Sequence, residues 1–568
     1  MTPEDDPRAR AKAAFQAAVT SAQQDLLVIA PPGCGKTELL AHRAAHLIDQ
    51  LDPNQKILAL TYSNKAKANL SARLTQVLGL ERRRRYVTVK NFHGHATEIL
   101  RSHGRTLDLD HEFEQPDKNQ LRAALVEHLD GLDENAASAI ASRVDDDLRT
   151  AKQRPYTDKQ VIEWLQAHGY EVSLQVEAAR QVAGTPYFDD LLRHAQRLIR
   201  VSEIADLYQR HYGVVLVDEF QDLSPQQLDL ALRSCSRSRT FVGDPLQGIY
   251  SWAGARPVLV ERQLRRICGD PEGLGHSYRS SPKVLTLLNA IAAELGGPVL
   301  ESIDPDAWHQ QGAATAVRLS TGVEEGQYIV DTARQILERT PEATIGVISR
   351  AGWRRRPIDA AFDAADLPAR RWDLAIDNDQ VLELLQQSAA GLGTDFTAEA
   401  LLANALDRLE PSDTDTRADV TEAVAQLVDI ASRGGSVAEA LEQLRDPGDP
   451  DNPIPPGVHL LNAHVGKGQQ FDWVFIPGFE DGHIPSFLAK TEAEVTEEMR
   501  ILLVMISRAR HGILVTRATE LISKKGNPYD TKPSRWSATL VGGLSMKPDQ
   551  LATHIAGLPA QSELIEGS

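Results

Sequence analysis

Short apolar runs alternate with longer amphipathic stretches along this chain, and the alternation predicts an α/β protein. A first group of runs lies at 25–30, 56–63, 212–220 and 239–244. A second group lies at 343–350, 458–464, 472–479 and 511–518. Each run has the length of a buried strand, so the two groups predict two α/β cores.

Two stretches outside these groups carry few strand signals. Residues 100–205 and 378–445 are rich in Ala, Leu, Gln and charged residues, which favours helices. The second stretch runs into the turn-rich segment 445–457. Both are predicted to be helical insertions into the α/β cores. After about residue 546 the pattern weakens, which favours a disordered tail.

The composition is that of a globular protein. The length of 568 residues predicts about three to five domains. No apolar run approaches the ~20 residues that span a membrane, and the polar N-terminus lacks the apolar core of a secretory signal. Cys34, Cys235 and Cys268 form no CxxC pair. We therefore expect no zinc site, no disulfide framework and a cytoplasmic protein.

The net charge of −18 argues against a protein that coats nucleic acid along its whole surface. It is compatible with a narrow basic channel, because affinity depends on local phosphate neutralisation. The strongest basic run, "ERRRRYVTVK" at 81–90, has two interpretations that the sequence leaves open. It is either a solvated helix end or turn, or a contact with phosphates.

The segment "APPGCGKT" at 30–37 has the features of a phosphate-binding loop, because an apolar run precedes it and an amphipathic stretch follows. Glycine at 33 and 35 lets backbone N–H groups turn toward a phosphate. Lys36 would neutralise the β- and γ-phosphate oxygens, and the Thr37 hydroxyl would bind Mg²⁺. A chance glycine-rich turn is the alternative. The predicted nucleotide contacts in the loop are Ala30, Pro31, Pro32, Gly33, Cys34, Gly35, Lys36 and Thr37.

A pair of acids ends the third apolar run, in "LVDEFQD" at 216–222. Asp218 would hold Mg²⁺ through water, and Glu219 would polarise the water that attacks the phosphate. The alternative is an ordinary acidic helix cap after a strand.

The segment "VGDPLQGIYSWAGA" at 242–255 adds an amide and two aromatic rings. Gln247 would sense the γ-phosphate or its attacking water. Tyr250 and Trp252 would point the same way in an extended segment and could stack on bases, at ~1–3 kcal/mol per base. Spacing alone favours the alternative, two core aromatics.

Residues 497–510 are predicted to form a helix that carries Ile501, Val504, Met505 and Arg508 on one face. An arginine at the end of an apolar stripe is costly to bury unless it meets an anion. Glu497 lies ~16 Å away along such a helix, so a nucleotide phosphate is the more attractive partner. The alternative is an arginine that extends to solvent.

In their order along the chain, these motifs resemble those of the UvrD/Rep/PcrA family of superfamily 1 helicases, from Gln16 to about Trp536. The resemblance also covers 58–70, 89–100, 276–285, 346–350 and 464–475. It implies two RecA-like domains, 1A and 2A, that hold ATP in the cleft between them. Helical domains 1B and 2B are inserted into them. Opening and closing of the cleft would move single-stranded DNA by one step per ATP, usually 3′→5′.

The resemblance implies these bounds: 1A at 1–100 and 206–275, 1B at 101–205, 2A at 276–377 and 455–545, a reduced 2B at 378–454, and a tail at 546–568. Gln16 would read adenine, Tyr278 would pack on it, and Gln247 would couple hydrolysis to movement. Arg279 and Arg508 would reach the γ-phosphate. The implied contacts with nucleic acid are Tyr62, Asn64, His93, Tyr250, Trp252, Arg350 and His464.

Four features depart from the family pattern. Glu38 stands where many members carry an arginine near the nucleotide base, and Gln470 stands where a glutamate usually binds the ribose. Both changes bear on nucleotide selectivity. Ala253 replaces an arginine that would contact DNA, and the 2B-like insertion is short.

The sequence therefore predicts an ATP- and Mg²⁺-dependent 3′→5′ DNA helicase or translocase in DNA repair or replication, with single-stranded DNA and strand junctions as partners. A protein partner, either a nuclease or a repair factor, is compatible with this prediction. One alternative is a translocase that works beside a nuclease in antiphage defence. Another is an inactive nucleic-acid clamp, against which the intact Lys36, Asp218 and Glu219 argue.

Overall fold

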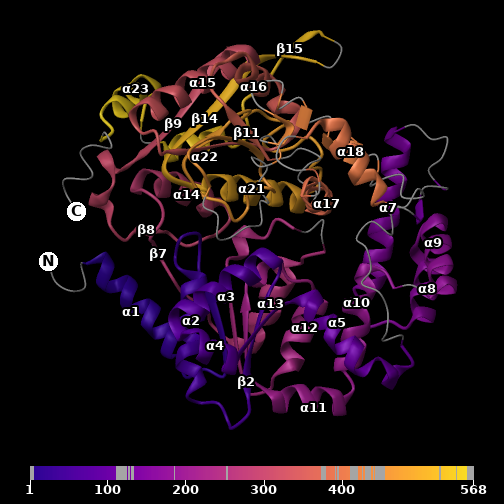
Figure 1. Ribbon diagram of the computed structural model, residues 1–568. Coiled ribbons are helices and arrows are strands. Elements are labelled where there is room, and N and C mark those ends of the chain that lie inside the picture. The colour runs from indigo at the N-terminus through magenta and orange to yellow at the C-terminus, as the bar shows by residue number, and fades with distance from the viewer. Residues whose placement is uncertain are drawn as a thin grey trace. The chain divides into compact units, whose positions relative to one another are not determined.

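The computed structural model describes residues 6–109, 134–184, 186–250, 254–372, 379–390, 396–409, 454–523, 526–544 and 546–559, with single residues in 124–128, at 392 and in 417–441. The chain forms two compact units, Met1–Leu274 and Gly275–Ser568. Figure 1 shows both, with the colour running from indigo through magenta to yellow along the chain. Each unit is described by itself.

Among the described residues, unit 1 holds a six-stranded parallel sheet in the order β3-β2-β4-β5-β1-β6. The strands are β1 (Asp25–Ile29), β2 (Lys56–Thr61), β3 (Val87–Asn91), β4 (Tyr212–Asp218), β5 (Ser238–Gly243) and β6 (Glu272–Gly273). Their helices are α1 (Pro7–Thr20), α2 (Lys36–Ile48), α3 (Asn64–Leu78), α4 (Leu80–Tyr86), α5 (Phe92–His103), α11 (Ser202–His211), α12 (Pro225–Ser234) and α13 (Pro257–Cys268). Because the strands are parallel, their carboxyl ends share one edge, where α/β proteins place ligands.

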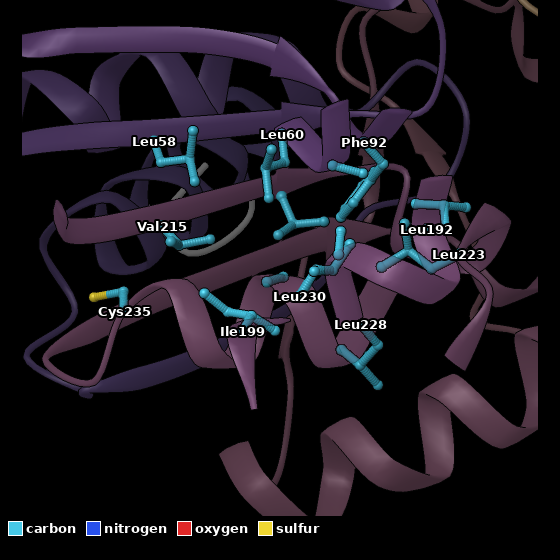
Figure 2. Packing of buried hydrophobic residues seen from close by; sticks show 14 of the residues in the cluster. Leu58, Leu60, Phe92, Leu192, Ile199, Val215, Leu223, Leu228, Leu230 and Cys235 are labelled. Carbon is cyan, nitrogen blue, oxygen red and sulfur yellow. The ribbon is translucent and has the colours of Figure 1, made fainter. Parts of the chain in front are cut away.

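The core of unit 1 lies between the central strands and the helices on one face of the sheet. Figure 2 shows Leu58, Leu60 and Val215 from the strands in the same layer as Phe92 and Ile199 from helices. All five side chains are completely buried. Strand β4 is buried at every position, as expected for a central parallel strand covered on both faces.

The helical insertion of unit 1 has a core of its own. It contains α7 (Glu134–Lys152), α8 (Asp158–His168) and α9 (Glu171–Ala183), followed by α10 (Phe188–Ile199). Its buried cluster includes Val144, Leu148, Val161 and Leu165. The apolar face of α10 instead joins the core beside the sheet, so this helix connects the insertion to the α/β part of the unit.

Unit 2 is built on the same plan. In its described part a seven-stranded sheet runs β11-β12-β10-β13-β14-β15, with β9 also paired to β14 and only β15 antiparallel. The strands are β9 (Ala313–Thr321), β10 (Thr344–Ser349), β11 (Ala369–Arg371), β12 (Gly457–Asn462), β13 (Phe471–Ile476), β14 (Ala509–Ile522) and β15 (Pro528–Asp530), beside a small pair β7 (His276–Ser277) and β8 (Glu301–Ser302). The helices are α14 (Pro282–Glu294), α15 (Gly322–Arg339), α16 (Gly352–Ala364), α17 (Asp379–Ala389), α18 (Ala398–Asp407), α21 (Glu492–Ile506), α22 (Ser537–Gly543) and α23 (Pro548–Ala556).

The two predicted α/β cores are confirmed, and all eight apolar runs form strands, six of them within two residues of the expected bounds. Helices α17 and α18 lie in the second predicted insertion and share a separate buried cluster. Within the described ranges no helix is long and apolar enough to cross a membrane. The division into 1A, 1B, 2A and 2B stays a prediction.

Two expectations about the C-terminal part were wrong. The helix expected over 497–510 is α21, which begins at Glu492 behind a capping box formed by Thr491 and Glu494 and ends at Ile506. Beyond it the chain enters β14, whose pairing with β13 replaces helical bonding. Within the tail expected to be disordered, residues 548–556 form α23, because Leu551 and Ile555 bury their side chains in the core of unit 2.

Candidate functional site

The phosphate-binding loop leaves the carboxyl end of β1 in unit 1. The Ala30 N–H donates to the Gly243 carbonyl at 2.8 Å, which fixes the start of the loop beside β5. Gly33 and Gly35 have φ of 80° and 85°, a left-handed conformation that other residues adopt only at a cost. Helix α2 begins directly afterwards at Lys36, so the N-terminal end of the helix dipole faces the loop. The loop therefore has the geometry expected of a phosphate cradle.

Lys36 meets one of the two predicted acids. Its Nζ lies 3.1 Å from Oε2 of Glu219, and the side chains are 12% and 29% exposed. Glu219 follows the end of β4 with φ of 54°, an unusual conformation for a non-glycine residue. This sharp turn aims the carboxylate at the loop, while Gln221 donates to the same oxygen at 2.6 Å.

Asp218, the last residue of β4, is the more deeply buried acid. Burial and the neighbouring Glu219 carboxylate raise the pKa of Asp218 to about 7, although Lys36 acts in the opposite direction. Its Oδ1 accepts a hydrogen bond from the Glu219 N–H at 3.0 Å. A buried carboxylate with a raised pKa is a frequent feature of functional sites, because a bound cation can stabilise its ionised form.

Gln247 joins the same group through two polar residues that sequence reasoning did not single out. The Gln247 amide donates to Oδ2 of Asp244 at 2.9 Å, and the Asp244 N–H donates to Oε1 of Gln221 at 3.0 Å. Gln221 in turn bonds Glu219, so the network links the loop after β5 to the acid that faces Lys36. Position alone could have indicated Gln221 and Asp244, since each follows the carboxyl end of a parallel strand.

The donor set at this edge fits Mg²⁺. Thr37 provides a half-buried hydroxyl in the first turn of α2, and Asp218 provides a carboxylate. Mg²⁺ prefers oxygen ligands and usually takes only one or two from protein, with phosphate and water supplying the rest. Among the described residues, no group of three or more His, Cys, Asp or Glu could hold a metal ion by itself.

The unit 1 residues expected near the nucleotide base, Gln16 and Glu38, lie on α1 and α2. Gln16 is exposed on α1, and the ring of the preceding Phe15 contacts His42 of α2 with centroids 5.7 Å apart. Glu38 accepts a hydrogen bond from His42 at 2.8 Å and forms an ion pair with Arg73 of α3. Glu38 replaces the arginine that many family members carry near the base. Arg73, which the sequence did not indicate, brings a guanidinium to the Glu38 carboxylate.

Two of the aromatic residues expected to contact nucleic acid stack on each other. The rings of Tyr62 and Tyr250 are nearly parallel, at 8°, with centroids 5.7 Å apart. Burial, followed by the nearby Asp222 carboxylate, raises the pKa of Tyr62 to about 12. His93 is half-buried at the start of α5. Tyr62 and His93 follow the ends of the neighbouring parallel strands β2 and β3, and Tyr250 lies in the loop after β5. All three therefore lie at the edge of the sheet that carries the cradle.

Trp252 and Ala253 lie outside the described residues, and so does the side chain of Asn64, whose backbone begins α3. The predicted extended pairing of Tyr250 with Trp252 is therefore not examined by the structure. The stacking partner of Tyr250 in the described chain is Tyr62, from a different strand end.

In unit 2 the structure brings Arg279 and Arg508 close together. The Ser280 hydroxyl donates to the Ala509 carbonyl at 2.8 Å, which joins the residues that follow each arginine. The Arg508 guanidinium is 3% exposed, so extension to solvent is wrong. It donates to the carbonyl oxygens of Val504 at 3.0 Å and Gln469 at 3.3 Å.

Tyr278 and Gln470 border the same region. Tyr278, immediately before Arg279, is 54% exposed. The exposed Gln470 follows the residue whose carbonyl Arg508 contacts. Unit 2 thus gathers all four of its predicted nucleotide contacts in one place.

Arg350 and His464, the unit 2 residues predicted on the nucleic-acid path, follow the adjacent strands β10 and β12. Arg350 donates to both carboxylate oxygens of Glu498, at 2.5 Å and 3.0 Å. Burial, together with the charge of Arg350, lowers the pKa of His464 to about 4, so this imidazole is neutral at physiological pH. Both side chains lie at the carboxyl edge of their sheet.

Comparison with known proteins settles the family. Residues 11–266 match the UvrD/REP helicase N-terminal domain, and residues 406–520 match the UvrD-like helicase C-terminal domain. The chain belongs to the UvrD-like helicase family. One match lies in each unit.

Relatives with established names support the assignment. The chain is 25% identical to the ATP-dependent DNA helicase PcrA of Leuconostoc citreum, over 95% of this chain and 85% of the relative. It is 24% identical to DNA helicase II of Escherichia coli K12, over 92% and 86% of the two chains. It is 30% identical to the ATP-dependent DNA helicase Rep of the same organism over a shorter region, 49% of this chain and 42% of Rep. These names favour the helicase hypothesis over the alternative with a nuclease.

Proposed function

We propose that this UvrD-like protein is an ATP-dependent DNA helicase that moves 3′→5′ along single-stranded DNA. The observation that carries the proposal is the Lys36–Glu219 ion pair beside the buried Asp218, at the carboxyl edge of the unit 1 sheet. A cationic loop residue next to two acids is the constellation that ATP hydrolysis requires. The family membership supports the proposal that this hydrolysis drives movement along DNA.

The mechanism begins with an exchange of partners at Lys36. In the structure its ammonium group pairs with Glu219. Phosphate oxygens of ATP compete for that ammonium group, and the backbone N–H groups around Gly33 and Gly35 add further donors. The Glu219 carboxylate is then free to orient water and take its proton. Mg²⁺, held by Thr37 and Asp218, would offset negative charge on the phosphates.

Information about the nucleotide would pass through the hydrogen-bonded network. Gln247 donates a hydrogen bond to Asp244, and the Asp244 N–H donates to Gln221. Gln221 and Lys36 both contact Oε2 of Glu219. Release of Glu219 by Lys36 therefore changes the partners of the loop after β5, on which Tyr250 stands. Arg279 and Arg508 are proposed, from the family resemblance, to act on the γ-phosphate.

The proposed polymer contacts are Tyr62, Tyr250, His93, Arg350 and His464, with Asn64 and Trp252 from the resemblance. Stacking rings and backbone cations suit single strands of any sequence. We propose the cytoplasm as compartment, because Cys34, Cys235 and Cys268 form no disulfide in the described chain. DNA repair or replication is the proposed process, with a repair factor as partner.

The test is strand displacement on a short duplex that carries either a 3′ or a 5′ single-stranded tail. We expect ATP-dependent unwinding of the 3′-tailed substrate alone. Lys36→Ala should abolish it, and Glu219→Gln should abolish it while ATP binding persists, with turnover at least about 100-fold lower. Unwinding of the 5′-tailed substrate alone would overturn the direction. Normal hydrolysis by Glu219→Gln would overturn the assignment of the base.

A further inference from the structure

We propose that Trp353 is a base-stacking residue of unit 2 that, with Phe487, extends the single-stranded DNA path beyond Arg350 and His464. The inference rests on the proposed function and adds a binding site to it. Trp353 is 41% exposed, the only exposed tryptophan among those in the described ranges, and Phe487 is 55% exposed. Leu488, 69% exposed, lies next to Phe487. Three large apolar side chains near one loop make a patch rather than a single exposed residue.

Both rings flank one turn that follows β13. The indole of Trp353 packs edge-on against the imidazole of His483, with centroids 5.5 Å apart and planes at 75°. The Phe487 N–H donates to the carbonyl of Gly482, the residue before His483, at 3.0 Å. Trp353 lies at the start of α16, directly after β10, so both sides of the patch come from the carboxyl edge of the sheet.

The patch is tied to the predicted DNA contacts by a shared carboxylate. Glu498 binds the Arg350 guanidinium and also accepts the Ser486 N–H at 2.9 Å. Ser486 directly precedes Phe487, so the residue that positions Arg350 also positions this ring. Burial, followed by the charges of Arg354 and Arg350, lowers the pKa of His483 well below its ordinary value, so Arg350 acts on the residue that supports Trp353.

The support beneath Trp353 is rigid. The neighbouring Arg354 is 1% exposed and pairs with Glu480 at 2.7 Å and Glu325 at 2.5 Å. Glu325 also accepts the Gly478 N–H at 3.1 Å, which anchors the beginning of the turn. A ring held in place before binding loses little conformational freedom on contact with a base.

The charge of the surroundings favours an anionic polymer over an apolar partner. The acids Glu325, Glu480 and Glu498 are each 6% exposed or less, and each is paired with an arginine. Arg356, one helical turn after Trp353, is exposed, and so is Lys490 after Leu488. The charge of Lys490 also acts on the exposed Glu494. Aromatic rings bordered by exposed cations fit bases and phosphates of a single strand.

The experiment measures the affinity of the full-length protein for a fluorescent oligo(dT) strand by anisotropy, without nucleotide. Trp353→Leu keeps apolar bulk and removes the π-face, so we expect affinity to fall about 5- to 150-fold. Trp353→Phe should stay within about threefold of wild type, because it retains a ring for stacking. Tyr529→Leu is the matched control, since Tyr529 is also 41% exposed in unit 2, and it should bind as wild type does.

Two further measurements distinguish a loss of stacking from a loss of phosphate contacts and from misfolding of a variant. The slope of log affinity against log salt should be the same for Trp353→Leu and wild type, because no phosphate contact is lost. In wild type, a strand that carries 5-iodouracil should form a photo-crosslink to Trp353 or Phe487. This reading does not depend on the folding of any variant.

The outcomes also separate the inference from the proposed function. If wild type binds oligo(dT) but Trp353→Leu binds equally well and no crosslink reaches this turn, the inference is overturned and the helicase proposal stands. An equal loss in Trp353→Phe and Trp353→Leu would also contradict stacking. If wild type itself fails to bind single strands, the proposed function fails first.

Discussion

At the scale of single residues, the site is defined by charges that a bound cation and phosphates would stabilise. Lys36 and Glu219 pair with each other, whereas Asp218 is buried beside the same glutamate with a raised pKa. A protein that holds a carboxylate in this way gives up stability, which a bound cation restores. The arrangement by itself therefore lowers stability, and it is useful to a protein that binds Mg²⁺ and ATP.

The first prediction concerns the stability cost of Asp218. The pKa of the Asp218 carboxyl is about 7 in the folded protein, compared with its ordinary value of 3.8. The stability that the protonated carboxyl contributes is therefore complete below pH 4 and is lost as the pH rises through 7. Asp218→Asn mimics the protonated form. We expect its thermal unfolding midpoint at pH 8 to exceed that of wild type by at least about 2–4 °C, the shift for about 1 kcal/mol.

The difference should shrink at pH 5, where wild-type Asp218 is itself protonated in the folded state. ATP hydrolysis should be lost in the same variant, measured as phosphate release. A variant that is no more stable than wild type at pH 8 would show that Asp218 carries no such cost.

At the scale of elements, a buried ion cluster joins the unit 1 insertion to the sheet core. Lys152, at the end of α7, is 1% exposed and lies 2.9 Å from both Glu177 of α9 and Asp190 of α10. Burial raises the pKa of Asp190, but the charges of Lys152 and two arginines outweigh it and hold that pKa well below its usual value. Because α10 packs in the core beside the sheet, the cluster fixes three helices to one another.

The second prediction tests that cluster. Lys152→Met should lower the free energy of unfolding of unit 1 by about 3–5 kcal/mol, because two buried carboxylates lose a partner. Lys159→Met is the control: this lysine is 86% exposed and 3.7 Å from Glu163, so its loss should not change stability measurably. Urea unfolding of both variants gives the comparison. Equal stabilities would mean that Arg180 and Arg193 already satisfy the two acids.

The elements also show what the sequence could and could not predict. Apolar runs such as 212–220 determined the strands because a central parallel strand has almost no polar position. Strand β3 was missed because its two buried valines follow a run of arginines in α4. The end of α21 was misplaced because Arg508 continues the helical spacing, and only pairing with β13 shows that the helix has stopped.

The features of the site also fall into those that the sequence could predict and those that depend on tertiary contacts. Lys36, Asp218 and Glu219 could be predicted because their roles depend on neighbours in sequence. The Tyr62–Tyr250 stack and the Glu38–Arg73 pair join residues from different elements, so their contacts depend on tertiary structure. The spacing of residues along the sequence does not indicate either contact.

At the scale of the whole molecule, the predicted nucleotide contacts are divided between the two units. Lys36 and Glu219 stand in unit 1, and Arg279 and Arg508 stand in unit 2. If both sets act on one ATP, hydrolysis must depend on residues of the unit that lacks the cradle.

The third prediction follows from that division. Arg279→Ala should lower kcat for ATP hydrolysis by about 10³-fold or more, the usual effect of losing an arginine that stabilises transferred phosphate. ATP binding should persist, because the cradle in unit 1 is intact. Arg334→Ala is the control, since this unit 2 arginine forms only a surface ion pair with Asp331. Unchanged kcat in Arg279→Ala would remove this residue from the mechanism.

The most direct test of the whole account is the rate of ATP hydrolysis by the wild-type protein with and without single-stranded DNA. Single-stranded RNA and blunt duplex DNA serve as parallel additions, and Lys36→Ala serves as the inactive control. The account predicts strong stimulation by single-stranded DNA, because nucleic acid and ATP act on the same connected strand ends. Hydrolysis that stays equally slow with every nucleic acid would contradict a motor that moves on DNA.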